Sequence, residues 1–86
     1  MTPVSESQNY KNITATTTVW TGSGGILGIF VASTSGGVLK VSDGANTIVN
    51  SFLPTAATFY PMPARFKDSL IVTVTGAVDA TVFWTN

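Results

Sequence analysis

The sequence contains no cysteine and no histidine among its 86 residues. The absence of cysteine excludes disulfide bonds, and the absence of both excludes most transition-metal sites, because these side chains are the usual ligands. An enzyme would have to activate a serine or threonine with a lysine, or use two carboxylates. The four carboxylates lie in the N-terminal segment and in expected turns, so a pair such as Asp43 and Asp79 is left open but not indicated. We therefore expect no enzymatic activity and no cofactor.

Charged residues are also scarce. Four lysines and arginines balance four aspartates and glutamates, and together they make up 9% of the chain. The surface of a soluble domain usually carries about 25–35% of such residues, so a monomer with so few would tend to associate. We therefore expect a homo-oligomer in which other subunits cover part of the surface. Nucleic acid is not expected as a partner, since binding it requires an excess of lysine and arginine.

The size of the chain also favours association. Eighty-six residues form one domain, whose small core leaves little net stability unless disulfides, a metal or partner subunits are added. Of these sources of added stability, only partner subunits remain for this chain. The longest apolar run, Ile26–Ala32, has seven residues and is too short to cross a bilayer. No basic segment precedes an apolar run near the N terminus, so we expect neither a signal peptide nor a membrane partner.

Short runs of alternating apolar and polar residues, rich in valine, threonine and aromatics, recur along the chain. The clearest are Tyr10–Trp20, Ile26–Thr34, Val38–Ser42, Thr47–Phe52 and Leu70–Trp84. This pattern predicts an all-β domain over residues 10–86. We expect a compact antiparallel β-sandwich, jelly-roll-like, or a small barrel of seven to eight short strands. Residues 1–9 are polar and form either a disordered tail or an N-terminal arm that orders on a neighbouring subunit.

Glycines and aspartates mark the expected turns. The last run is interrupted at Gly76–Asp79, which predicts a hairpin with Val74 opposite Val82. A turn is also expected at Ser35–Gly37, and a second hairpin begins at Asp43–Gly44.

Two further segments have distinctive patterns. Ile26–Thr34 is apolar on both sides of a strand as far as Ala32, so the core or a subunit interface should cover both sides. Gly28 within it would let another backbone or a large ring approach closely. Leu53–Lys67 contains three prolines, which cannot donate hydrogen bonds to a sheet. We expect this segment to form a loop, an edge strand or an extended crossover.

A set of aromatic, apolar and basic residues is predicted to contact partner subunits. Large rings commonly anchor interfaces, and the basic cluster before the last run could add polar contacts. Tryptophan and tyrosine rings could alternatively stack on sugars. The candidates are Tyr10, Trp20, Ile29, Tyr60, Arg65, Lys67 and Phe83. No catalytic, cofactor-binding or metal-ligating residue is expected.

Three motifs within Val38–Trp84 carry a resemblance to a known family. They are K-V-x-D-G at Lys40–Gly44, F-x-P followed by F-Y-P-x-P between Phe52 and Pro63, and L-x-V-T-x-x-G-x-V-D-A-T-V-F-W at Leu70–Trp84. With these motifs, the chain resembles small all-β virion structural proteins encoded among the structural genes of tailed bacteriophages and prophages.

The resemblance implies a virion component made in the bacterial host cytoplasm. We expect a capsid decoration or head-surface protein, a homo-oligomer of three subunits, that binds virion proteins such as the major capsid protein. Docking would use strand addition or apolar contact through the N-terminal arm and Tyr10–Trp20. The alternative is a head or tail fibre tip that binds a host receptor or glycan. The resemblance brings no catalytic or ligand-binding residue with it.

Overall fold

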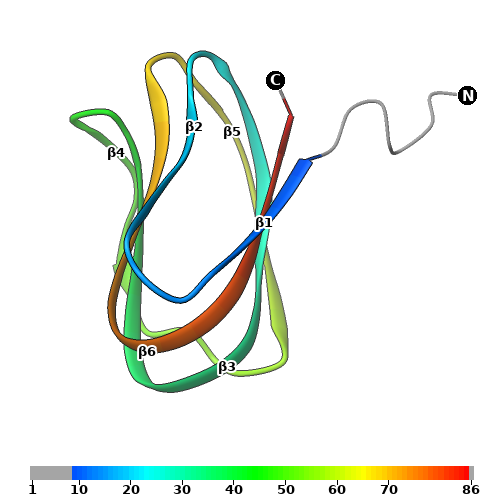
Figure 1. The fold of residues 1–86 in the computed structure, drawn as a ribbon, viewed down its shortest axis with the longest axis vertical. Helices are drawn as coiled ribbons and strands as arrows, with labels where there is room; N and C mark the ends of the chain where they lie inside the picture. Colours follow the sequence, from blue (N-terminus) through cyan, green and yellow to red (C-terminus); the bar gives the residue numbers. More distant parts are fainter. Residues whose placement is uncertain (1–8, 86) are drawn as a thin grey trace, which may run out of the picture.

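The computed structural model describes residues 9–85, which form six antiparallel strands in one open sheet (Figure 1). The strands are β1 (Asn9–Ile13), β2 (Thr17–Thr21), β3 (Gly24–Asp43), β4 (Asn46–Phe52), β5 (Thr58–Phe66) and β6 (Ser69–Thr85). The all-β class expected from the sequence is confirmed. The predicted arm lies outside the described residues except for Asn9, which begins β1.

The sheet is built on two long strands. β3 has 20 residues and β6 has 17, and they pair from Gly25 opposite Thr85 to Asp43 opposite Leu70. On one half of this pair, β1 flanks β6 and β5 flanks β3. On the other half, β2 flanks β6 and β4 flanks β3. Each half is therefore four strands wide.

Both long strands bend at the same place, at the bottom of Figure 1. Gly36 and Gly76 have positive φ angles of 69° and 83°, which residues with a side chain rarely adopt, and the β3–β6 register shifts between Ser35 and Gly36. Pairing continues across the bend, with Thr34 opposite Val78. The expected turns at Ser35–Gly37 and Gly76–Asp79 are therefore wrong, because each is a bend within one continuous strand.

Because of this bend, the strand pairing and the number of strands differ from those predicted from the sequence. Val74 pairs with Leu39 and Val82 with Ile29, rather than with each other. The four short strands expected on either side of the two glycine segments are thus two long ones. The expected strand Tyr10–Trp20 is instead divided between β1 and β2. Between these strands, Thr16 Oγ1 accepts a hydrogen bond from the Val74 amide at 3.0 Å.

Because the sheet bends, its two halves face each other and share one hydrophobic core. Two ring contacts join the halves: Trp20 and Trp84 have centroids 6.3 Å apart, and Phe52 and Tyr60 have centroids 5.2 Å apart. Among the described strands, no pairing joins β1 to β2 or β4 to β5, so the sheet does not close into a barrel. The buried apolar residues are Ile13, Val19, Ile26, Ile29, Val31, Leu39, Val41, Phe66, Leu70, Val72, Val78, Ala80, Val82 and Trp84.

Asp43 connects two turns at the end of the molecule opposite the bend. The expected hairpin at Asp43–Gly44 is confirmed, with Asp43 opposite Asn46. The Asp43 carboxylate also accepts hydrogen bonds from the backbone amides of Lys67 at 2.9 Å, Asp68 at 2.9 Å and Ser69 at 3.3 Å. These hydrogen bonds lower the pKa of Asp43 below its ordinary value, and those from the Asp68 and Lys67 amides have the largest effect. One side chain thereby holds the β3–β4 turn against the β5–β6 turn.

Candidate interaction surface

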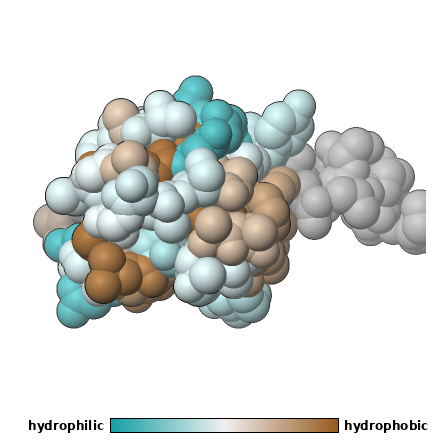
Figure 2. Space-filling view, turned by 90° about the horizontal axis from the view of Figure 1, so that it is seen from below, coloured by the Kyte–Doolittle hydropathy of each residue, from teal (hydrophilic) through white to brown (hydrophobic). Residues whose placement is uncertain are grey.

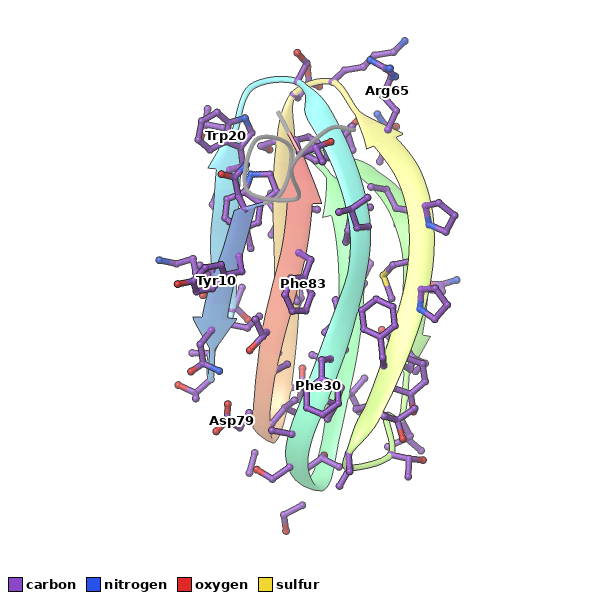
Figure 3. The ribbon with its side chains drawn as sticks, turned by 90° about the vertical axis from the view of Figure 1, so that its right-hand side faces the viewer. Tyr10, Trp20, Phe30, Arg65, Asp79 and Phe83 are labelled. Atoms are coloured by element: carbon purple, nitrogen blue, oxygen red, sulfur yellow. The ribbon has the colours of Figure 1, made fainter. Side chains whose placement is uncertain are left out.

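An aromatic surface covers the outside of the half sheet formed by β1, β6, β3 and β5, which faces the viewer in Figure 3. We define this aromatic face as Tyr10, Leu27, Phe30, Phe59 and Phe83. Strand pairing places its members side by side, because Tyr10 lies opposite Phe83 and Phe30 opposite Phe59. Four of them, all except Tyr10, line a shallow hollow of about 390 Å³.

The strand alternation explains why these side chains face outward. Phe30 and Phe83 each lie between two buried core residues, and Phe59 precedes Tyr60, which packs against the core. Tyr10 pairs with Phe83 and so shares its side of the sheet. A register shift in β3 between Ile26 and Gly28 leaves Leu27 on the outer side. The apolar run of β3 is thus covered by the core on one side only.

The aromatic face is substantially exposed. Tyr10 is 76% exposed, Phe59 48% and Phe30 37%. With about 200 Å² for a whole ring side chain, these three residues leave roughly 300 Å² of accessible aromatic surface. That area matches the largest apolar patch of a typical monomer, and patches of this size commonly bind a partner.

Gly28 lies beneath the centre of the aromatic face. A Cβ atom at this position would lie 2.5 Å from Cζ of Phe59, so the ring packs directly on the glycine backbone. The expectation that Gly28 admits a large ring is therefore confirmed. Phe59 also makes an edge contact with Phe83, with ring centroids 6.1 Å apart. The rings are thus held in place by the sheet and by each other.

Two opposite charges flank the aromatic face, at diagonally opposite corners of the view in Figure 3. Arg65 is exposed near the end of β5. Asp79 is half-buried beside the bend, and its Oδ1 accepts a hydrogen bond from Asn12 Nδ2 at 2.8 Å. Lys11 is the other charged residue of these four strand segments. It pairs with the inward-facing Val82, so it lies on the opposite side of the sheet from Tyr10.

The surface seen from the bend in Figure 2 is mostly pale or brown, with few hydrophilic areas.

The structure brings three of the seven candidate contact residues to this surface. Tyr10 and Phe83 belong to the aromatic face, and Arg65 lies at its edge. Trp20 and Tyr60 instead point to the inner side, where they are half-buried against the core. The Tyr60 hydroxyl also accepts a hydrogen bond from the Thr55 amide at 2.7 Å. These two rings join the halves of the sheet.

The remaining two candidates are differently placed. Ile29 is 0% exposed and belongs to the core, so it has no surface to offer a partner; this correction follows from the register of β3. Lys67 is exposed in the β5–β6 turn, where its backbone amide donates to Asp43.

Three residues of the aromatic face, Leu27, Phe30 and Phe59, were not predicted as contact residues. The signal was present in part, because Ile26–Thr34 is apolar on both parities and one of them had to face outward or be covered. Which parity faced outward depended on the register shift at Leu27.

The described part of the chain provides no arrangement of metal-ligating side chains, since residues 9–85 contain no group of three or more aspartates or glutamates that could hold an ion. Both oxygens of Asp43 accept backbone hydrogen bonds, and Asp79 lies near the bend, away from Asp43. No helix among the described residues is long and apolar enough to cross a membrane.

The sequence matches no protein-family model, no curated protein and no solved structure. The aromatic face is therefore the feature of the described residues from which a function can be proposed.

Proposed function

We propose that this chain is a non-enzymatic structural component of a tailed-phage virion, a capsid decoration protein that assembles as a homo-oligomer on the head surface. The observation that carries the proposal is an aromatic face left uncovered on a chain with few charges. A surface of this kind is stable in water when another protein covers it. The resemblance over Val38–Trp84 supplies the virion context.

The shape of the chain supports a role on a protein shell. A chain of 86 residues needs little room on a lattice, and its principal extents are 38, 29 and 16 Å. Among the strands that the structure describes, β1 and β2 pair only with β6, which supports docking of their other edge on the major capsid protein by strand addition. The N-terminal arm is proposed to take part in the same docking.

A fibre tip that binds a host receptor or glycan is the second candidate, because it too requires exposed aromatic rings. Sugar sites combine ring faces with polar groups that fix the orientation of the ligand. The hollow in the aromatic face is lined only by Leu27, Phe30, Phe59 and Phe83, none of which has a polar side-chain atom. This lining favours contact with protein over contact with glycan.

The test is a binding measurement with particles of the phage or prophage that encodes the chain. Capsids lacking the protein are mixed with the purified full chain and sedimented, and the bound copies are counted by quantitative gel or mass spectrometry. We expect saturable binding with a fixed number of copies per particle. A chain that leaves the capsids bare but binds host surface polysaccharide would contradict the decoration role and support the fibre tip.

A deletion separates the contribution of the N-terminal arm. Removing residues 1–8 leaves β1 intact, so the truncated chain should fold. Reduced occupancy on the capsid is expected if the arm docks, whereas full occupancy would remove the arm from the docking mechanism.

A further inference from the structure

We infer that the aromatic face is the interface of a two-fold symmetric homodimer, in which Arg65 of each copy lies opposite Asp79 of the other. The inference rests on the proposed homo-oligomer and assigns its contact surface and symmetry. It replaces the trimer expected from the sequence with a dimer whose two faces are identical.

The charge distribution on this face is self-complementary. Among residues 9–85, this side of the half sheet carries one cation, Arg65, and one anion, Asp79, near diagonally opposite corners, with the aromatic face between them (Figure 3). A two-fold axis that lies in the interface and crosses the line from Arg65 to Asp79 at a right angle exchanges these two corners. One rotation therefore forms two opposite-charge pairs and superposes the apolar centres. A face that binds nucleic acid or another anionic surface would instead carry an excess of basic groups.

The exposed rings supply part of the area that such a contact requires. Each copy contributes roughly 300 Å² from three rings, so a dimer would bury roughly 600 Å² of ring surface from the two copies. A standard interface buries about 1,600 Å² in total, and the rings would supply more than a third of it. The half-buried Leu27 and Phe83 and the exposed Pro61 and Pro63 add to the same contact.

The edges of this half sheet favour face packing over strand addition on the β5 side. Pro61 and Pro63 lie in β5, which pairs with β3 alone among the described strands, and neither proline can donate a backbone hydrogen bond to an added strand. A second copy would instead stack on the outer face, as sheets do at about 10 Å separation.

The first experiment measures the mass of the full chain by light scattering across a concentration series. We expect twice the chain mass of 9.0 kDa. Arg65→Asp or Asp79→Arg alone would place like charges opposite each other twice per dimer, so each should weaken dimerisation about tenfold. The double variant restores opposite charges and should recover dimerisation to near the wild-type level, a result that a purely local effect on folding would not produce.

The second experiment tests the rings. Phe30→Thr keeps a good strand former and removes an exposed ring from both copies, so dimerisation should weaken about 100-fold. Leu53→Thr is the matched control, because Leu53 is 72% exposed but lies in the loop between β4 and β5, off the aromatic face. Its dimer should equal the wild type. Circular dichroism establishes that each variant is folded.

The outcomes separate this inference from the proposed function. A wild-type monomer at high concentration overturns the dimer. A trimer overturns the two-fold contact but leaves a homo-oligomeric virion protein standing, as does a dimer that tolerates every substitution on the face. Capsid binding is measured independently, so its loss with the dimer intact overturns only the decoration role.

Discussion

Replacing Gly28 with alanine should destabilise the fold, because the glycine leaves no room for a side chain. A Cβ atom there would lie 2.5 Å from the Phe59 ring and 2.7 Å from the Tyr60 carbonyl oxygen. The ring is 48% exposed and can swing outward. The carbonyl belongs to the β5 backbone, so β5 must move by about 0.7 Å for the pair to reach an ordinary contact at 3.4 Å.

The magnitude follows from these two responses. Moving the Phe59 ring outward loses its packed half, about 100 Å², which corresponds to about 2.5 kcal/mol. Overpacking that shifts a backbone costs about 1–3 kcal/mol. Alanine restricts the unfolded chain and offsets about 0.4–1 kcal/mol of this. We expect a net loss of about 2.5–5 kcal/mol in the free energy of unfolding, and a melting temperature lower by roughly 10–40 °C for a domain of this size.

The assay is thermal and urea unfolding at one fixed protein concentration, since association would make the midpoint concentration-dependent. Gly25→Ala is the matched control, because its Cβ would lie 3.4 Å from the nearest atoms and its φ angle is not positive. Adding Phe59→Ala to Gly28→Ala should relieve the ring clash but leave the Tyr60 carbonyl in the way. A Gly28→Ala protein as stable as Gly25→Ala would refute the close packing of β5 on β3.

Three further substitutions test buried groups. Asp43→Asn should destabilise the fold at neutral pH, because the Asp68 and Lys67 amides stabilise the charged carboxylate and hold the pKa of Asp43 below 3.8. The charged carboxylate stabilises the folded state fully above pH 3.8, and this contribution is lost as the pH falls through the lower folded-state pKa. Urea midpoints of variant and wild type should converge in acid, and a gap independent of pH would contradict the role of the charge. Trp84→Phe should change the free energy of unfolding by less than about 1 kcal/mol, because losing a buried indole N–H without a partner among the described residues offsets the lost ring volume. A loss above about 3 kcal/mol in urea titration would show that the N–H is bonded. Ile29→Ala should cost about 2–5 kcal/mol in the same titration, since Ile29 is 0% exposed in the core, and a neutral result would remove it from the core.

The all-β class could be predicted from the sequence, because side chains alternate between two sides in any β-strand. The length of the strands could not be predicted. Leu70, Val72, Val82 and Trp84 all have even numbers and all face the core. A bend at Gly76 keeps that parity, and so would a hairpin at the same glycine. The difference depends on β3, which remains paired with β6 through the bend.

The interaction surface was predictable only in part. Tyr10 and Phe83 are aromatic residues in alternating strands, and the structure places both on the outer face. Phe59 was missed because its proline-containing segment was not assigned to one kind of structure. Phe30 was missed because the outward side of β3 is set by its register shift near Leu27. Ile29 was assigned to a surface for the same reason. A local irregularity of one residue thus decides which rings a partner can reach.

The chain order of the central strands has a consequence for biosynthesis. β6 is made after the other five strands, yet β1, β2 and β3 all pair with it. While the nascent chain is still on the ribosome, the apolar residues of β3 lack their principal neighbour, and pairings between such distant segments form slowly. The sheet should therefore assemble only after β6 has been synthesised, so ribosome-bound fragments that end before Ser69 should be degraded by protease as readily as an unfolded chain.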